Sequence, residues 1–187
     1  PLRNENDRSI ARKFSFKSTH SLRMCTALLR QLLSFHGARA VSFPVDGGGL
    51  DPASFPPDGK PALIVVSPAR QFPTGAIMPM KRRAALAEFA ERAGAYLLED
   101  NFESEFNYDA PPVSSLYELA PERVLSVGTF SNVLYPSVRL GYLAAPPELT
   151  APLCERKRLS DHHTNPVYQL ALASFLSDGT LEKHIRR

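Results

Sequence analysis

The sequence lacks any long apolar run and any N-terminal targeting segment. None of its apolar stretches approaches the roughly 18 residues that a membrane-spanning helix needs. The first residues, PLRNENDRSIARK, have no apolar middle of the kind that a secretory signal peptide carries, and they do not begin with Met. We therefore expect a cytoplasmic protein with no membrane partner, and we expect this sequence to be a piece of a longer chain.

Cysteine is also scarce. Only Cys25 and Cys154 are present, far apart and outside any CxxC pair, which argues against a disulfide framework or a zinc site. The adjacent His162 and His163 would point in different directions on a helix and make a poor metal pair. No metal site is predicted, and the two cysteines are interpreted as ordinary buried thiols.

The net charge of +3 is unevenly distributed. Residues 1–30 carry seven basic and two acidic residues, so the remainder of the chain is slightly acidic. A basic arm can indicate a nucleic-acid partner, although no recognition motif accompanies this one. A solvated linker or an exposed helix face explains the same pattern, and both interpretations stay open.

The 187 residues contain no internal repeat and no low-complexity tract, and 43% of them are apolar. Short apolar strands alternate with amphipathic helices, which is typical of an α/β domain with a mostly parallel central sheet flanked by helices. Pro44 favours an edge position for the first strand. Strands are predicted at 40–45, 62–67, 95–99, 124–128 and 139–145, and helices at 21–35, 79–93, 114–119, 147–160 and 166–177.

The clearest helix covers residues 79–93. It has a proline near its start and Gly94 near its end, as helices often do. Leu86, Phe89 and Ala90 form an apolar stripe that would face the core. The charged residues of this helix are predicted to face outward: Lys81, Arg82, Arg83, Glu88, Glu91 and Arg92.

Three polar loops follow predicted strands. They read SPARQFPTG, DNFESEF and TFSNVLYPSVR. In parallel sheets, ligand-binding groups gather in the loops beyond the carboxyl ends of the strands. These loops are therefore the predicted site.

The third loop carries groups that suit a phosphate. Thr129 and Ser131 offer hydroxyls, and Arg139 offers a guanidinium that can form charge-assisted bonds to phosphate. A capping serine and a surface arginine would leave the same pattern. In the second loop, Asp100 could pair with a protonated ring nitrogen of a phosphate-bearing heterocycle, or could merely cap a helix. Phe102 is interpreted as a packing residue.

The three loops in this order resemble the large domain of fold-type-I, pyridoxal-phosphate-dependent aminotransferases. They look most like the aminotransferase-like domain of GntR/MocR-type transcription regulators, in which the motifs read approximately TPSHQFPTG, EDDYDSEF and GTFSKTLxPxLRLGY. The ending FLSDGTLEKHIRR is similar to a helix that the family places after these loops. The resemblance covers about residues 33–187. It implies a partial large domain over 21–187, preceded by an unmatched basic segment at 1–20.

The resemblance implies pyridoxal 5'-phosphate, bound without a covalent link, as the cofactor. Asp100 would bond the pyridine nitrogen, and the turn at 73–75 would lie beside the ring. The residues implied in cofactor binding are Asp100, Phe102, Thr129, Ser131, Asn132 and Arg139, with Ser131 and Arg139 on the phosphate and Thr129 in support.

This sequence departs from the family at three positions. Asn132 stands where the family has the lysine that forms the Schiff base, and an amide nitrogen is not a usable nucleophile. No catalytic residue is therefore predicted. Phe102 replaces a tyrosine that bonds the ring oxygen, and Arg70 stands where histidine is common. Whether the chain is an enzyme stays open, and a catalytically impaired aminotransferase-like transferase domain is the first hypothesis.

Two alternatives accompany it. One is a ligand-sensing effector domain of a MocR-type regulator, and the other is a decayed fragment with no cofactor. The resemblance implies an amino acid or pyridoxal phosphate as the small-molecule partner, DNA contact only through a domain outside this chain, and a homodimer. It also places the family's small domain beyond residue 187.

Overall fold

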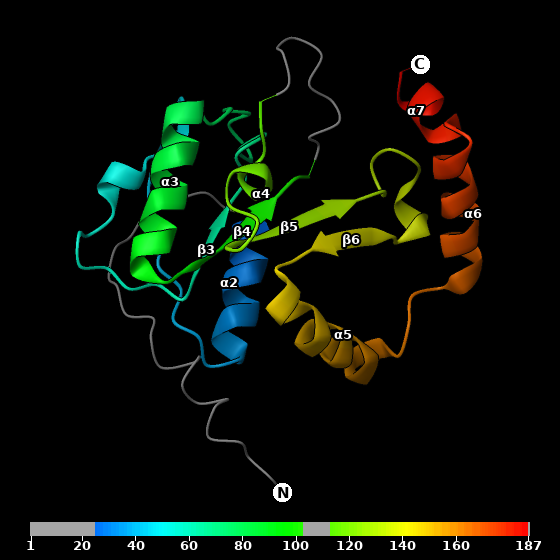
Figure 1. Ribbon diagram of the computed structural model, residues 1–187, viewed down its shortest axis with the longest axis horizontal. Coiled ribbons are helices and arrows are strands. Elements are labelled where there is room, and N and C mark those ends of the chain that lie inside the picture. The colour runs from blue at the N-terminus through cyan, green and yellow to red at the C-terminus, as the bar shows by residue number, and fades with distance from the viewer. Residues whose placement is uncertain (1–24, 103–112, 187) are drawn as a thin grey trace, which may run out of the picture.

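The structure is a computed structural model that describes residues 25–102 and 113–186 (Figure 1). Four strands form the central sheet in the order β3-β4-β5-β6. The first three are parallel, and β6 runs antiparallel to β5, so the prediction of a mostly parallel sheet is confirmed. The strands are β3 (Leu63–Val66), β4 (Tyr96–Asp100), β5 (Val124–Thr129) and β6 (Gly141–Ala144).

Helices lie around this sheet, and two of the described helices connect its parallel strands (Figure 1). The predicted helices are all present within the described ranges, and a short one follows them near the C-terminus. The helices are α2 (Cys25–Phe35), α3 (Met80–Ala93), α4 (Leu116–Leu119), α5 (Pro147–Asp161), α6 (Pro166–Ser177) and α7 (Thr180–Ile185). The boundary predicted between residues 20 and 21 lies outside the described residues.

Local signals fix both ends of α3. Pro79 is the N-cap in an extended conformation, and Gly94 is the C-cap in the left-handed region with φ of 65°. The Gly94 N–H is donated to the carbonyls of Ala90 and Glu91. Because glycine adopts positive φ without steric cost, it ends this helix where the sequence predicted.

The main core lies between α3 and the sheet. The predicted stripe of Leu86, Phe89 and Ala90 is buried there, against side chains that include Leu97 and Val124. Truncating a fully buried leucine such as Leu86 to alanine typically costs about 2–5 kcal/mol. This core fixes the positions of β3, β4 and β5, and hence of the loops that follow them.

A second core holds the loop that follows β5. Val133, Val138 and Leu140 of that loop are buried against Leu172 of α6 and Leu181 of α7. In Figure 1, α6 and α7 stand beside the end of β5 where this loop begins. The C-terminal helices therefore support the third predicted loop.

The strand predicted at 40–45 is wrong. Residues 41–44 form no strand, and a short antiparallel hairpin follows them, with β1 (Val45–Asp46) paired to β2 (Gly49–Leu50). Pro44 has no N–H to donate to a ladder, which accounts for the absence of pairing before Val45. A guanidinium nitrogen of Arg82 bonds Asp46 Oδ2 at 2.7 Å and so ties this hairpin to α3.

Three other expectations also fail. Arg83 is buried rather than outward-facing, and the thiol of Cys154 is exposed. The last strand begins at Gly141 instead of 139, because the chain makes a 3-10 turn at Pro136–Val138 and Arg139 has a φ of 51°. Extended pairing cannot include a residue in that conformation.

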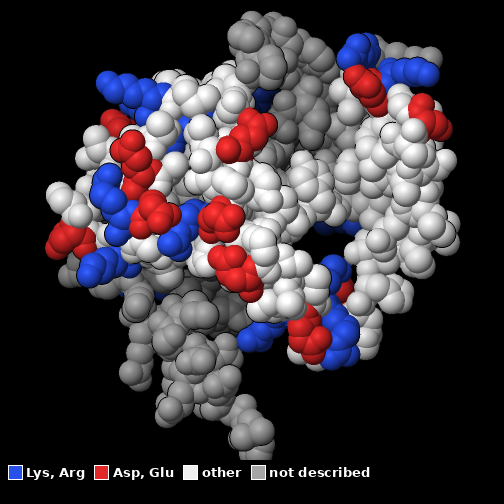
Figure 2. All heavy atoms as spheres, viewed as in Figure 1, with Lys and Arg blue, Asp and Glu red and all other residues white. Residues whose placement is uncertain are grey.

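Charge is unevenly distributed over the surface. Figure 2 shows acidic and basic side chains mixed over the α3 side of the molecule, and an uncharged region over α6. The sequence of α6 contains no acidic or basic residue, and Val167, Leu170, Phe175 and Leu176 are exposed on it. Within the described ranges, no helix has both the length and the apolar character required to cross a bilayer.

Candidate functional site

Sheet topology brings the three predicted loops to one edge. Since β3, β4 and β5 are parallel, their carboxyl ends meet at the same edge, and antiparallel β6 begins there. Asp100 pairs in register with Val127, and Thr129 pairs with Gly141. The end of β4 and the two ends of the 130–140 loop therefore share this edge (Figure 1).

The first loop, 68–78, contains a tight hairpin. The Gly75 N–H is donated to the Gln71 carbonyl at 2.7 Å, and the Gln71 N–H to the Ala76 carbonyl at 2.8 Å. Gly75 has a φ of 71°, which suits glycine. Phe72 and Thr74 are exposed. The turn predicted at 73–75 is present, and its tip faces solvent.

The second loop begins at Asp100, whose side chain is half-buried. Its Oδ1 accepts the Phe102 N–H at 3.1 Å, a local turn that orients the carboxylate. Asn101 joins β4 to β5, because its N–H is donated to the Val127 carbonyl at 2.9 Å and its side-chain amide to Ser126 Oγ at 2.7 Å. The Asn101–Ser126 hydrogen bond was not predicted, because no sequence motif indicates it.

Phe102 does not pack into either core. Its side chain is 44% exposed. The interpretation of Phe102 as a packing residue stays a prediction, because the residues that follow it lie outside the described ranges. The remaining residues of the DNFESEF motif, 103–106, lie outside the described residues.

The third loop uses one of its predicted hydroxyls internally. The Thr129 hydroxyl donates to the Leu140 carbonyl at 3.3 Å, and its Oγ1 accepts a hydrogen bond from the Ser131 N–H at 3.1 Å. The Phe130 N–H also reaches the Leu140 carbonyl, at 3.0 Å. Thr129 therefore closes the loop onto its own far end. The Ser131 hydroxyl and the Arg139 guanidinium remain as the phosphate-type donors.

Arg139 stands between two anchored neighbours. Val138 and Leu140 are buried in the second core, whereas Arg139 is exposed. A non-glycine residue in the left-handed region costs roughly 1–2 kcal/mol, and such conformations gather at functional sites. Arg139 therefore lies outside the second core, in the loop that follows β5. Asn132 and Ser131 of the same loop are half-buried.

Two glycines allow β5 and β6 to approach closely. A Cβ atom at Gly128 would overlap the ring of Tyr142, and a Cβ at Gly141 would lie 2.8 Å from the Gly128 carbonyl oxygen. The Tyr142 ring also lies 5.7 Å from that of Phe130. The Tyr142 ring thus occupies the space that a side chain at position 128 would need.

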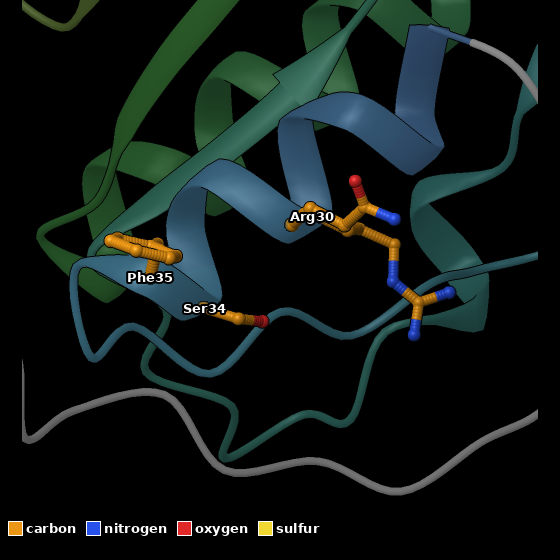
Figure 3. A pocket seen from close by; sticks show the side chains of 4 residues that line it. Arg30, Ser34 and Phe35 are labelled. Atoms are coloured by element: carbon orange, nitrogen blue, oxygen red, sulfur yellow. The ribbon is translucent and has the colours of Figure 1, made fainter.

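A hollow lies against α2, outside the three predicted loops. Figure 3 shows it against α2, lined by Arg30, Gln31, Ser34 and Phe35. All four residues come from one helix, and none belongs to the predicted site. In the part of the chain that the structure describes, no group of three or more His, Cys, Asp or Glu side chains is arranged to hold a metal ion.

The chain is similar to curated transcription regulators. It is 37% identical over 159 residues to the HTH-type pyridoxine biosynthesis transcriptional regulator PdxR of Corynebacterium glutamicum, covering 85% of this chain and 35% of that protein. It is 36% identical over 154 residues to the probable rhizopine catabolism regulatory protein MocR of Rhizobium meliloti, covering 81% of this chain and 31% of that protein. The chain thus spans about a third of these relatives.

Solved structures show the same fold. The α-aminoadipate aminotransferase LysN of Thermus thermophilus, complexed with N-(5'-phosphopyridoxyl)-L-leucine, superposes with a TM-score of 0.76 at 28% identity, covering 83% of this chain and 43% of that chain. No protein-family model matches the sequence. The chain is therefore homologous to MocR-type transcription regulators and to aminotransferases, and it has the fold of the fold-type-I aminotransferases.

Proposed function

We propose that this domain binds pyridoxal 5'-phosphate without a covalent link. The observation that carries the proposal is the position of Asp100 at the carboxyl end of β4, next to β5 and the loop of Ser131 and Arg139 that follows β5. When bound, pyridoxal phosphate supplies an electron sink for amino-acid chemistry. In the LysN structure, a phosphopyridoxyl compound is bound to a protein of the same fold.

The residues present fit such a ligand at its two polar ends. Asp100 can accept a bond from a protonated ring nitrogen, since its carboxylate is half-buried and is oriented by the Phe102 N–H. The Ser131 hydroxyl and Arg139 guanidinium can hold the phosphate, because a guanidinium forms two parallel bonds to phosphate oxygens. Thr129 keeps their loop closed, and Phe102 offers an exposed ring beside the site.

Asn132 limits what this domain can do. Its amide nitrogen is delocalised into the carbonyl, so it cannot attack a carbonyl carbon. It also cannot take and return a proton, and losing a general base typically costs about 10²–10⁴-fold in rate. We therefore expect transamination by this chain to be absent or very slow. Binding and orientation are what the remaining residues would retain.

Titration calorimetry with pyridoxal phosphate tests the binding. We expect micromolar affinity, weakened about 10–100-fold in Arg139→Gln because a bond to a charged group contributes about 1.5–3 kcal/mol. Arg92→Gln is the matched control, since Arg92 is an exposed arginine on α3 whose partner is Glu88. Equal weakening in both variants, or no binding by the unaltered chain, would contradict the proposal and favour a decayed fragment.

Asn132→Lys tests the covalent link directly. If the site is otherwise intact, this variant with pyridoxal phosphate gains a visible absorption band, and borohydride fixes the ligand to the protein. The unaltered chain should give neither signal. A borohydride-stable adduct on the unaltered chain, mapped to position 132 by mass spectrometry, would overturn the role assigned to Asn132.

A regulatory role is the second candidate. The names of two relatives with 36–37% identity describe transcription regulators, and loss of turnover chemistry leaves ligand sensing intact. In that role the domain at 21–187, acting in the cytoplasm, would sense pyridoxal phosphate or an amino acid, and DNA would be bound by a separate domain. The test is whether operator binding by the full-length protein changes with ligand, and whether Arg139→Gln abolishes that change.

A homodimer is proposed on the apolar face of α6. Val167, Leu170 and Leu176 are each more than half exposed there, and a contiguous apolar surface marks an interaction site. Sedimentation of the unaltered chain and of Leu170→Glu would test the contact. A monomeric unaltered chain would remove it.

A further inference from the structure

Arg83 is a buried cation that bonds three separate backbone segments. Its side chain is on α3 and is 2% exposed. Its three nitrogens each donate a hydrogen bond to a backbone carbonyl: Nε to Met78 at 3.0 Å, Nη2 to Pro68 at 2.9 Å, and Nη1 to Ser114 at 2.8 Å. The planar fork of a guanidinium is the one side chain that can reach three carbonyls in fixed directions.

Two of these carbonyls, those of Pro68 and Met78, belong to the first and last residues of the first loop. The Met78 N–H is itself donated to the Pro68 carbonyl at 2.9 Å. Arg83 therefore closes the base of the 68–78 loop from inside, while the hairpin tip at 71–76 stays exposed. A tip that makes few core contacts depends on its base for its direction relative to the sheet.

The third carbonyl belongs to the return of the second loop. Ser114 precedes α4, and the first amides of α4 are donated to the buried carboxylate of Glu99: Leu116 N–H at 2.7 Å and Tyr117 N–H at 3.3 Å. Glu99 immediately precedes Asp100 on β4 and attracts Arg83 electrostatically. The end of β4, the start of α4 and the first loop thus share one buried network.

Burying this guanidinium is costly, and burial lowers the pKa of Arg83. An apolar side chain of similar volume often serves stability as well as a buried charge does. It could not, however, donate to three carbonyls or set the direction of two loops. A role in packing alone therefore leaves the three bonds unexplained.

We propose that Arg83 is a positioning residue that presets the 68–78 hairpin against the Asp100 end of β4. The ligand part of this proposal rests on the proposed function. The hairpin part rests only on the bonds that Arg83 makes. In this role Arg83 touches no ligand and acts through the backbone of the two loops.

The test compares Arg83→Met and Arg83→Lys with Arg82→Met. Arg82 is the neighbouring arginine on α3, and it bonds the β1–β2 hairpin instead of the site loops. Hydrogen exchange of the Gln71, Gly75 and Met78 amides reports the hairpin, and the Phe130 amide reports the second core. Calorimetry with pyridoxal phosphate reports the ligand site.

In Arg83→Met we expect the hairpin amides to exchange at least about tenfold faster, since a lost buried hydrogen-bond partner costs about 1–3 kcal/mol. The Phe130 amide should change less. Pyridoxal phosphate binding should weaken about tenfold or more by the same arithmetic. In Arg83→Lys, the exchange rates and the affinity should fall between those of Arg83→Met and those of the unaltered chain. Arg82→Met should leave the exchange rates of the hairpin amides and the affinity near those of the unaltered chain.

The proposal would be overturned if the hairpin amides exchanged no faster in Arg83→Lys than in Arg82→Met. This comparison can still be made if Arg83→Met does not fold. Faster hairpin exchange with unaltered affinity would overturn the ligand part. Absence of ligand binding in the unaltered chain would instead overturn the proposed function, because the exchange readout needs no ligand.

Discussion

Replacing Glu99 with glutamine probes the buried network beneath the site. The Glu99 carboxylate is fully buried and accepts two backbone amides of α4, at 2.7 and 3.3 Å. Glutamine has nearly the same volume but only one acceptor oxygen. Its NH2 group would face one of the two amide donors, so one bond is lost and one buried donor is left unsatisfied.

The size of the effect follows from these contacts. A hydrogen bond to a charged group contributes about 1.5–3 kcal/mol, and removing one member of a buried charge pair costs about 3–5 kcal/mol. Because the side-chain carbonyl of glutamine keeps one bond, and Arg83 keeps its three carbonyls, we expect the lower end. Glu99→Gln should reduce the free energy of unfolding by about 3 kcal/mol.

Urea unfolding followed by circular dichroism measures this loss. Glu91→Gln is the control, because Glu91 lies on the surface of α3 and pairs with Arg123 at 2.9 Å. Exposed pairs contribute about 0–1 kcal/mol, so the control should lose no more than that. If the two variants lose the same amount of stability, the network around Glu99 does not hold the second loop as the contacts indicate.

Three further predictions concern the β1–β2 hairpin, the packing of β5 against β6, and the second core. The hydrogen bond from Arg82 lowers the pKa of Asp46 from 3.8 to about 2. Between these two pH values the unfolded state binds more protons, so the stability that Asp46 contributes is present above pH 3.8 and is lost as the pH falls toward 2. In Asp46→Asn, the free energy of unfolding should therefore fall less steeply over this pH range. Gly128→Ala should destabilise by about 1–3 kcal/mol through overlap with the Tyr142 ring, and Tyr142→Ala in the same chain should recover part of the loss in thermal unfolding. Leu172→Ala should lower the free energy of unfolding by about 2–5 kcal/mol and weaken ligand binding by loosening the 130–140 loop. Leu159→Ala is the control, because Leu159 is an exposed leucine on α5, and it should change neither the free energy of unfolding nor the affinity.

Local pattern predicted most of the elements because their signals lie within a few residues. The run Leu63–Val66 is rich in β-branched residues and forms a parallel strand in which Ile64 and Val66 are buried. Gly94 ends α3 because positive φ suits glycine. The strand predicted at 40–45 was wrong because Pro44 has no N–H to donate to a ladder, and pairing begins only at Val45. The order β3-β4-β5-β6 explains why residues from three distant motifs reach one edge.

Charge misled the interpretation of α3. Arg83 was predicted to face solvent because arginine is rarely buried. It lies three residues before Leu86, on the same face of the helix, and that spacing was the available signal of burial. The carbonyls that stabilise it belong to Pro68, Met78 and Ser114, which only the folded chain brings together.

The sequence by itself determined the alternation of strands and helices, the three polar loops and the replacement at Asn132, since each depends on residue type and local spacing. Only the tertiary structure decided that Thr129 bonds the far end of its own loop and that Arg139 is exposed between two buried neighbours. It likewise decided that Arg83 bonds backbone carbonyls of two loops. These outcomes depend on which backbone carbonyls and apolar side chains arrive from distant segments, and hydrogen-bond direction and burial are fixed only when those segments meet.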